Sequence, residues 1–158
     1  MSQDLAKFAS DRGIRYFLIS FVDLFGVLRA KLVPASAIAQ MQRDGAAFAG
    51  FATHLDLTPA DPDMFAIPDP ASLIQLPWKS EIGWLAADLH LGGKPLEHAP
   101  RHVLKCQIAS AEAKGYRMKT GVEAEFFVLR AEGGPSPTSW TGRRSPATTR
   151  PHSCADTS

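Results

Sequence analysis

Two glutamates, Glu123 and Glu125, stand one residue apart at the start of the apolar run VEAEFFVLR and are the residues best suited to chemistry. Side chains alternate along a β-strand, so a strand here places both carboxylates on one face. Like charges this close repel unless water screens them or a cation lies between them, and for paired carboxylates that cation is usually Mg²⁺ or Mn²⁺. Taken alone, the pattern is more typical of an exposed strand end. The rest of the chain favours a divalent-cation site at Glu123 and Glu125.

The other polar candidates have structural explanations. Asp23 lies in the sequence DLFG, where it is best explained as a turn-forming residue. His98 and His102 are four residues apart, but Pro100 lies between them, so they straddle a helix start and do not form a helical ligand pair. Gly92-Gly93-Lys94 lacks the spacing of a phosphate-binding loop and indicates a hairpin turn.

Three further residue types give no site. Cys106 and Cys154 have no neighbouring Cys or His cluster, so we interpret them as buried or bystander thiols. Arg101, at a helix start, is expected to be a solvated arginine, although it could contact an anion. Trp78 and Trp84 are expected in the core or at a domain interface.

Length and charge narrow the class of protein. The chain has 158 residues, with 17 Lys and Arg against 16 Asp and Glu. This length suits one domain, or one small domain and part of another. The basic residues are scattered, which argues against nucleic acid or an anionic membrane as a partner. The first residues carry acids and lack a signal-type apolar core, and no apolar run reaches spanning length, so we expect a cytoplasmic protein.

The pattern of apolar and turn residues predicts a small α+β unit with an antiparallel or mixed sheet. The expected elements, in chain order, are a helix over 2–12 ending at Gly13, a hairpin of strands 14–22 and 27–33, a helix from 38 to about 45, an ordered loop over 45–69, strands over 72–76 and 82–87, a turn at 91–94, and a helix from Pro100 to Gly115. The strand that carries Glu123 and Glu125 comes next. A helix followed by a strand at this point in the chain indicates the beginning of a second domain.

The composition changes after Gly134, where the chain becomes rich in Pro, Ser, Thr and Arg and loses hydrophobic periodicity. A disordered tail is one interpretation. The other is a frameshift from about Pro135 onward, natural or introduced in sequencing. Codons that encode Arg144–Thr157 can be chosen so that another frame reads KPCYDTAALMRRY, a sequence typical of a folded protein. Codon degeneracy permits this choice and does not force it.

Five collinear segments of the ordered region resemble the N-terminal part of the glutamine synthetase family, and most closely its branch of type III glutamine synthetases and glutamate–methylamine ligases. The segments, in the family's order, are FVDLFGVLRAKLVP (21–34), DGAAFAGFA (44–52), PDPASLIQLPW (68–78), PRHVLK (100–105) and GVEAEFF (121–127). Each one alone is weak, but five in order are specific. The same shift applied to Pro135–Arg143 permits VSDELDRPT, and the joined reading DELDRPTKPCYD resembles the segment that comes after the E-x-E motif in that branch.

The resemblance implies three segments: a β-grasp N-terminal domain over 1–97, the beginning of a catalytic domain over 98–134, and the irregular tail over 135–158. It also implies an ATP-dependent carbon–nitrogen ligase that joins glutamate to ammonia or a small alkylamine through a γ-glutamyl phosphate. In such enzymes both acids of the E-x-E-F-F motif bind divalent cations, so Glu123 and Glu125 become ligands for Mg²⁺ or Mn²⁺. The family also implies a homo-oligomer, in which the N-terminal domain contributes to a neighbour's active site.

Two departures from the family pattern matter. Ala49 stands where better-known glutamine synthetases carry an Asp that helps bind and deprotonate ammonium, so a more apolar pocket wall would suit a methylated amine. The remaining metal acids, the glutamate-binding residues and most of the nucleotide pocket lie beyond the E-x-E strand in the family. We therefore expect no complete site in this chain. The alternative function is a noncatalytic β-grasp module that binds or regulates a partner.

The nucleotide sequence tests the frameshift hypothesis directly. We expect the codons from Pro135 onward to yield KPCYDTAALMRRY in another frame and to open a long catalytic reading frame downstream. Codons that cannot yield this string would end the hypothesis, and a clean stop with no such frame would favour the binding module.

Overall fold

The computed structural model describes residues 4–126. Contacts divide the chain into a unit over residues 1–119 and a second unit over residues 120–158, so the body formed by residues 4–119 is described first and by itself. Its class is mixed α+β with a curled sheet, as the sequence predicted at the level of class. The boundary expected near residue 97 stays a prediction.

The elements, in chain order, are α1 (Leu5–Arg12), β1 (Tyr16–Val22), β2 (Leu28–Pro34), the 3₁₀ turn η1 (Ala35–Ala37), α2 (Ile38–Asp44), β3 (Ala46–Phe48), η2 (Gly50–Thr53), β4 (Met64–Pro68), η3 (Pro70–Ser72), β5 (Ile74–Gln75), β6 (Ile82–Leu91), β7 (Lys94–Pro95) and α3 (Pro100–Ala113). The hairpin and the three helices lie where the sequence predicted them. The loop expected over 45–69 was wrong in part, because it contains β3 and β4, which pair with each other.

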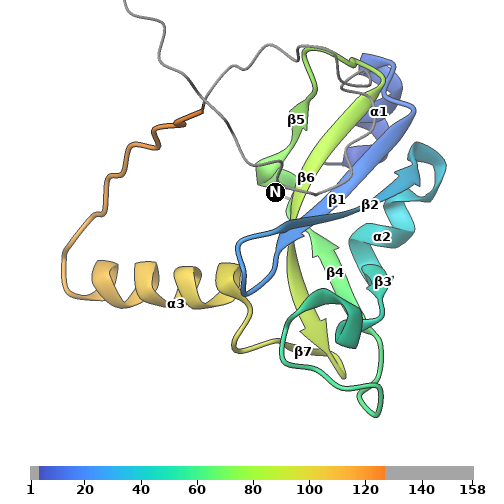
Figure 1. Ribbon diagram of the computed structural model, residues 1–158. Coiled ribbons are helices and arrows are strands. Elements are labelled where there is room, and N and C mark those ends of the chain that lie inside the picture. Colours follow the sequence, from blue (N-terminus) through green and yellow to red (C-terminus); the bar gives the residue numbers. More distant parts are fainter. Residues whose placement is uncertain (1–3, 127–158) are drawn as a thin grey trace, which may run out of the picture. The chain divides into compact units, whose positions relative to one another are not determined.

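The main path of the sheet runs β2-β1-β6-β4-β3 (Figure 1). β6 is the central strand, parallel to β1 and antiparallel to β4. It also pairs with the short strands β5 and β7. The helices α1 and α2 lie on one side of the sheet, and α3 extends away on the other side. The sheet is therefore mixed, and every strand outside β6 reaches it directly or through one neighbour.

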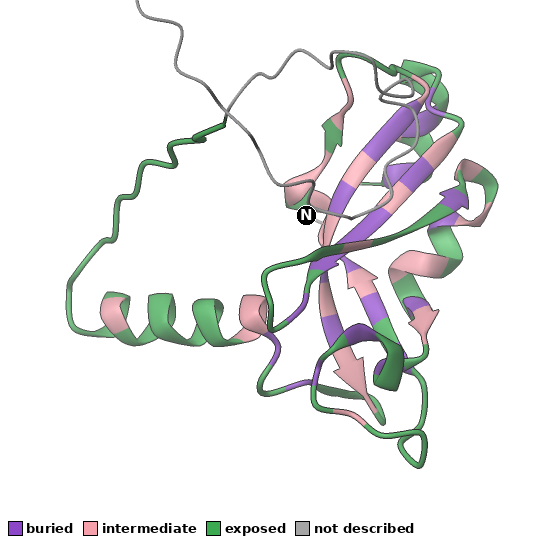
Figure 2. Ribbon diagram, in the orientation of Figure 1, coloured by how far each residue is buried: buried purple, intermediate pink, exposed green. Residues whose placement is uncertain are grey.

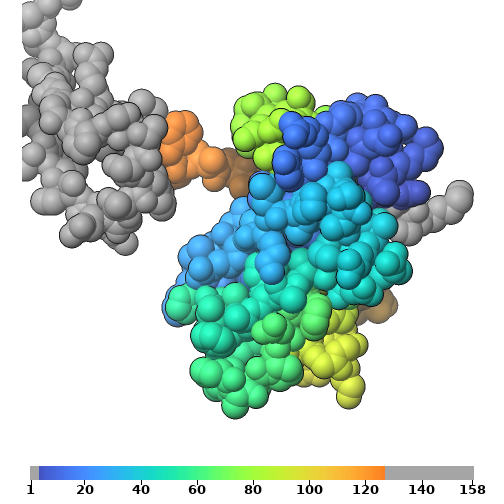
Figure 3. Space-filling view, turned by 90° about the vertical axis from the view of Figure 1, so that its right-hand side faces the viewer, coloured from blue at the N-terminus to red at the C-terminus, as the bar shows by residue number. Residues whose placement is uncertain are grey.

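The core lies on the α1 and α2 side of the sheet. Leu5 of α1, Phe17 of β1, Ile38 of α2 and Leu85 of β6 are all fully buried there. The space-filling view shows α1, α2 and the following loop covering this side (Figure 3). Gly83 belongs to the same packing, since a side chain at this position would meet the Phe17 ring at 2.8 Å.

The two end strands of the sheet path approach each other because the sheet curls. The Lys31 ammonium of β2 donates to the Ala47 carbonyl of β3 and lies 4.8 Å from the centre of the Phe48 ring. Phe21 of β1 contacts the same Phe48 ring edge to face, with centroids 4.9 Å apart. β3 and the loop after it are thereby tied to the β1–β2 hairpin, which is far away in the sequence.

The opposite face of the sheet is largely uncovered. It carries apolar side chains with substantial exposure, among them Val22, Leu28 and Leu32, whose exposed fractions are 40%, 56% and 53%. Figure 2 shows buried residues along the central strands and mostly exposed residues along α3, which therefore gives this face little cover. An apolar sheet face with this exposure is a binding or packing surface in most proteins.

A fully buried aspartate holds the β1–β2 turn. The Oδ1 atom of Asp23 accepts hydrogen bonds of 2.9 Å from the backbone N–H groups of Phe25 and Val27, and its Oδ2 atom accepts one of 2.9 Å from Arg29 Nε. The sequence prediction that Asp23 forms the turn is confirmed. Burial by itself would raise the pKa of Asp23, but the hydrogen bonds from Val27, Arg29 and Phe25 outweigh it and lower the pKa below its ordinary value of 3.8.

A second ion-pair cluster fixes the first turn of α3. Arg101 Nε donates to Asp88 Oδ1 at 2.9 Å, and Arg101 Nη2 donates to Asp69. Lys105 Nζ donates to the other oxygen of Asp88 at 2.5 Å. The expectation of a solvated Arg101 was wrong, because the sheet alternation places Asp88 on the uncovered face, where α3 begins. The helix has no buried residue, so this cluster supplies much of its attachment.

We expect Asp23→Asn to lower the melting temperature by roughly 5 °C or more, because Arg29 loses its ion-pair partner in the buried turn. A lowered pKa means that the ionised Asp23 stabilises the fold above pH about 4 and that this contribution is lost as the pH falls through the folded-state pKa. Thermal unfolding from pH 7 to pH 2 should therefore show the two proteins converging at acidic pH. Asp61→Asn is the matched control, since Asp61 holds an exposed turn at Thr58. A gap between Asp23→Asn and the unmodified protein that does not narrow between pH 7 and pH 2 would contradict this account.

We expect Arg101→Ala to loosen α3, because an isolated helix of this length is marginal in water. Removing the guanidinium leaves two half-buried carboxylates without this partner and should cost about 1–2 kcal/mol. Hydrogen exchange measured by mass spectrometry should speed up in peptides covering Val103–Ala111 and stay unchanged in β1. Lys7→Ala, which removes an exposed pair with Asp11, serves as the control and should leave α3 unaffected. Equal exchange in α3 with and without Arg101 would contradict the role of the cluster.

Candidate functional site

Glu123 and Glu125 lie in the second unit, of which the structure describes residues 120–126. Both glutamates are exposed, and residues 116–126 form neither helix nor strand. The strand expected at this position is therefore wrong for its described part, and Phe127 to Arg130 lie outside the described residues. A strand needs a hydrogen-bonded neighbour, and no described strand pairs with this segment. Without strand geometry, the alternation that would place both carboxylates on one face does not apply.

The donor chemistry of these two residues fits a divalent cation, but the described residues do not complete a site. Carboxylate oxygens are the ligands that Mg²⁺ and Mn²⁺ prefer, and such ions take about six of them, including waters. No group of three or more His, Cys, Asp or Glu residues gathers anywhere in residues 4–126 in a way that could hold a metal ion. Glu123 and Glu125 thus form at most part of a metal site. Their role as ligands stays a prediction.

The loop after β3 is the second candidate region, because it contains Ala49. Ala49 is exposed and directly precedes η2, where the Thr53 hydroxyl donates a 2.6 Å hydrogen bond to the Gly50 carbonyl. A side chain at Gly50 would lie 2.4 Å from Leu57, so only glycine fits there without a shift. Phe51, next along the chain, is 54% exposed. Ala49 and Phe51 therefore present apolar side chains to solvent on either side of the tightly packed Gly50.

The same loop carries backbone strain. His54 and Asp56 both have positive φ angles, 51° and 56°, although neither is glycine. Neighbouring contacts hold this conformation: the His54 ring lies 5.3 Å from the Phe25 ring, and His98 Nε2 lies 2.6 Å from the Leu55 carbonyl oxygen. Strained residues persist where the surrounding structure over-determines them, and they cluster at functional sites. This observation supports the loop as a functional candidate.

The structure also shows where the histidines, cysteines and glycines singled out from the sequence lie. His98 and His102 are used in different contacts, since His102 Nε2 lies 3.5 Å from Cys106 Sγ. Cys106 is exposed, which corrects the buried alternative, and Cys154 lies outside the described residues. Gly92 and Gly93 form the turn between β6 and β7 as predicted, with φ angles of 56° and 77°.

The two tryptophans differ in exposure, and two other residues on the strands were not singled out from the sequence. Trp78 is 80% exposed and is not a core residue. Trp84 is half-buried on the uncovered sheet face. Sequence reasoning missed Asp88, although the alternation of Trp84, Ala86 and Asp88 along β6 would have placed it on that face. It also missed Ser20, for which the sequence carries no signal.

No helix within residues 4–126 has the length and apolar character needed to cross a membrane. Within residues 4–126, the buried Asp23 pairs with Arg29, and the half-buried Arg101 pairs with Asp69 and Asp88.

Comparison with known proteins gives strong similarity to one family. Over 133 aligned residues, the chain is 62% identical to the glutamine synthetase of Rhizobium leguminosarum bv. phaseoli. This alignment covers 84% of this chain and 31% of that protein. The chain is 39% identical over 126 residues to the glutamate–methylamine ligase of Methyloversatilis universalis, covering 78% of this chain and 28% of that protein. No family profile matches the chain.

A solved structure agrees with these sequences. The GmaS/ADP complex superposes with a TM-score of 0.70 at 61% sequence identity, covering 72% of this chain and 26% of that chain. The chain therefore spans about a third of the length of the curated relatives that it matches. By sequence and by fold, the matched segment of this chain is similar to part of the glutamine synthetases and of the glutamate–methylamine ligase.

Proposed function

We propose that this chain carries part of an ATP-dependent ligase that joins glutamate to ammonia or a small alkylamine. The observation that carries the proposal is the 62% identity over 133 residues to a glutamine synthetase, together with the E-x-E-F-F sequence at Glu123 and Glu125. In the proposed reaction, ATP phosphorylates the γ-carboxylate of glutamate, because a carboxylate oxygen is a poor leaving group. The amine then displaces phosphate from the γ-glutamyl phosphate to give the amide.

Glu123 and Glu125 are the proposed ligands for Mg²⁺ or Mn²⁺, with ATP as the co-substrate. A divalent cation bound there would neutralise charge that accumulates between nucleotide and substrate. The proposed beginning of the catalytic domain, residues 98–134, includes α3 and the two glutamates, and residues 1–97 are the proposed β-grasp domain. In a homo-oligomer this domain would contribute the Ala49 loop to a neighbouring active site.

The environment of Ala49 supports an alkylamine over ammonium. An acid at this position would attract ammonium, whereas the methyl group of Ala49 and the exposed ring of Phe51 offer an apolar wall. Relatives of the chain include a protein named glutamate–methylamine ligase and, at 27% identity, one named gamma-glutamylanilide synthase. A contact surface without a charge suits an amine that carries a carbon substituent.

A chimera tests the proposed function. Residues 14–130 of this chain would replace the matching segment of the Rhizobium leguminosarum glutamine synthetase, and ligation of glutamate to ammonium and to methylamine would be followed by ADP release. We expect an active chimera that Glu123→Gln slows by about 100-fold or more, because a carboxylate ligand is lost. We also expect Ala49→Asp to raise kcat/KM for ammonium relative to methylamine.

Glu97→Gln is the matched control, since Glu97 is an exposed acid of the same type in the body of the chain. It should leave turnover unchanged. A folded chimera that stays inactive, or one that is equally active with Glu123→Gln, would overturn the enzyme assignment and favour the noncatalytic module. The unfused 158-residue chain is expected to show no turnover, because its described residues form no complete metal cluster.

A further inference from the structure

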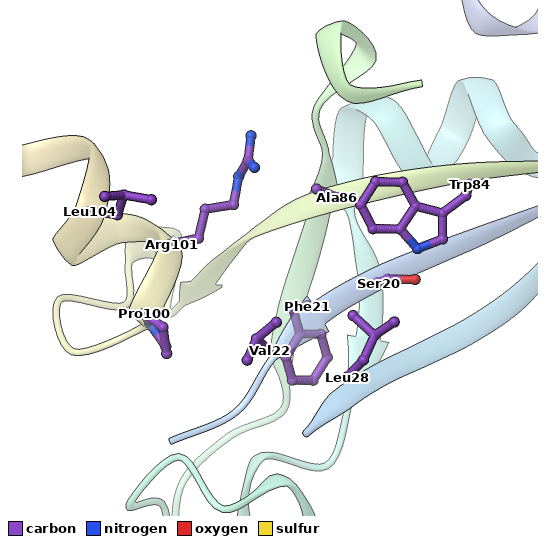
Figure 4. Close-up of a pocket in the computed structure, with 9 residues that line it drawn as sticks. All are labelled: Ser20, Phe21, Val22, Leu28, Trp84, Ala86, Pro100, Arg101 and Leu104. Atoms are coloured by element: carbon purple, nitrogen blue, oxygen red, sulfur yellow. The ribbon is translucent and has the colours of Figure 1, made fainter. Parts of the chain in front are cut away.

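His98 joins two segments that lie far apart in the sequence. Its ring atom Nε2 lies 2.6 Å from the Leu55 carbonyl oxygen. A carbonyl oxygen only accepts hydrogen bonds, so Nε2 carries the proton and donates. His98 belongs to the connection from β7 to α3, whose first turn contains Pro100 and Arg101 (Figure 4). Leu55 belongs to the strained loop after η2. The hydrogen bond therefore ties this loop to the start of α3.

The core holds the backbone at both ends of this hydrogen bond. Leu96 and Ala99, which flank His98 in the sequence, are 5% and 2% exposed, and Leu55 is fully buried. The Leu96 N–H also donates to the Leu89 carbonyl of β6 at 2.8 Å. His98 itself is exposed, so its ring reaches the loop from outside the core. A substitution of His98 therefore removes the hydrogen bond without leaving a cavity in the core.

The loop needs contacts from outside to keep its conformation. The Leu55 carbonyl stands between His54 and Asp56, whose φ angles are 51° and 56°. Residues other than glycine keep such angles only where the surrounding contacts offset the strain. One such contact comes from the β1–β2 turn, where the Phe25 ring meets the His54 ring edge to face. The hydrogen bond from His98 is a second one, and it acts on the residue between the two strained positions.

The placement of Leu55 reaches Ala49 through Leu57. Leu57 packs so closely on Gly50 that a side chain at Gly50 would lie 2.4 Å from it. Gly50 separates Ala49 from Phe51, the two apolar residues that form the amine wall in the proposed function. A shift of the Leu55 carbonyl would move Leu57 and release its contact with Gly50. The amine wall is therefore placed only as firmly as Leu55 is.

We propose that His98 is a positioning residue for the loop over residues 49–57. Its Nε2–H holds the Leu55 carbonyl and thereby fixes the amine wall of Ala49 and Phe51. This inference rests on the proposed function, in which that wall contacts the amine, and His98 acts only through the loop. Because the wall contacts the amine in the bound state and in the transition state alike, loss of the hydrogen bond weakens amine binding and leaves the chemical step unchanged.

The full 158-residue chain tests the hydrogen bond without any turnover. Long-range ¹H–¹⁵N NMR of the histidine rings should show His98 with a proton on Nε2. His98→Leu removes the donor, whereas His98→Gln keeps an amide N–H at similar reach. Hydrogen exchange over residues 49–57 should be about tenfold faster in His98→Leu and close to the unmodified rate in His98→Gln. His102→Leu is the matched control, since His102 contacts Cys106 within α3, and it should leave the loop unchanged.

The chimera with the Rhizobium leguminosarum glutamine synthetase tests the effect on the amine. We expect His98→Leu to raise KM for methylamine about five- to tenfold and to change kcat by less than about twofold, as loss of uniform binding requires. His98→Gln should restore most of the affinity, because the amide supplies the missing donor. His102→Leu should change neither constant.

The results separate this inference from the proposed function. A His98 ring protonated only on Nδ1, equal loop exchange with and without the donor, or an unchanged KM in an active chimera carrying His98→Leu would overturn the inference alone. So would a His98→Gln variant as impaired as His98→Leu. A folded chimera that is inactive with His98 present would instead overturn the proposed function, and the role of His98 in amine binding would fall with it.

Discussion

The pairing of β6 with strands on both of its edges is the constraint on which the rest of the structure depends. β6 joins the hairpin of β1 and β2, from one end of the chain, to β4 and β3, which come after α2. Because β6 is parallel to β1, the chain must cross over between the two strands. This connection contains α2, β3, β4 and the strained loop at His54 and Asp56. The loop that carries Ala49 is therefore positioned by a strand that comes after it in the sequence.

The same pairing creates two unequal faces. The side chains of Leu85, Ala87 and Leu89 enter the core beneath α1 and α2, whereas those of Trp84 and Ala86 lie on the uncovered face. Helix α3 does not bury this second face, because it is attached mainly through ion pairs at its first turn. Arg101 thus fixes where α3 begins without closing the apolar surface beside it, where a pocket of about 380 Å³ remains open (Figure 4).

The sequence correctly predicted the elements that are defined by residue patterns within the element itself. The β1–β2 hairpin follows from its apolar strands and from the turn around Asp23, and Gly13 ends α1 with the left-handed φ of 68° that its position predicted. β3 and β4 were missed, because their residues look irregular until the curl of the sheet brings Phe48 against Phe21 and Lys31. The alternation of side chains along β6 was enough to place Asp88 on the uncovered face. Its pairing with Arg101 could be assigned only from the three-dimensional structure.

The twin glutamates show the limit of a sequence motif most clearly. Their types and spacing predict a cation site, and the similarity to glutamine synthetases supports that prediction, yet the described chain leaves both side chains exposed and outside any strand. Carboxylates repel each other and prefer water until other ligands and a cation make the desolvated arrangement favourable. A metal site of this kind is therefore a property of the assembled fold and not of the two residues. Under the proposed function, Glu123 and Glu125 would become such a site once further acids and a neighbouring strand are supplied, as in the chimera.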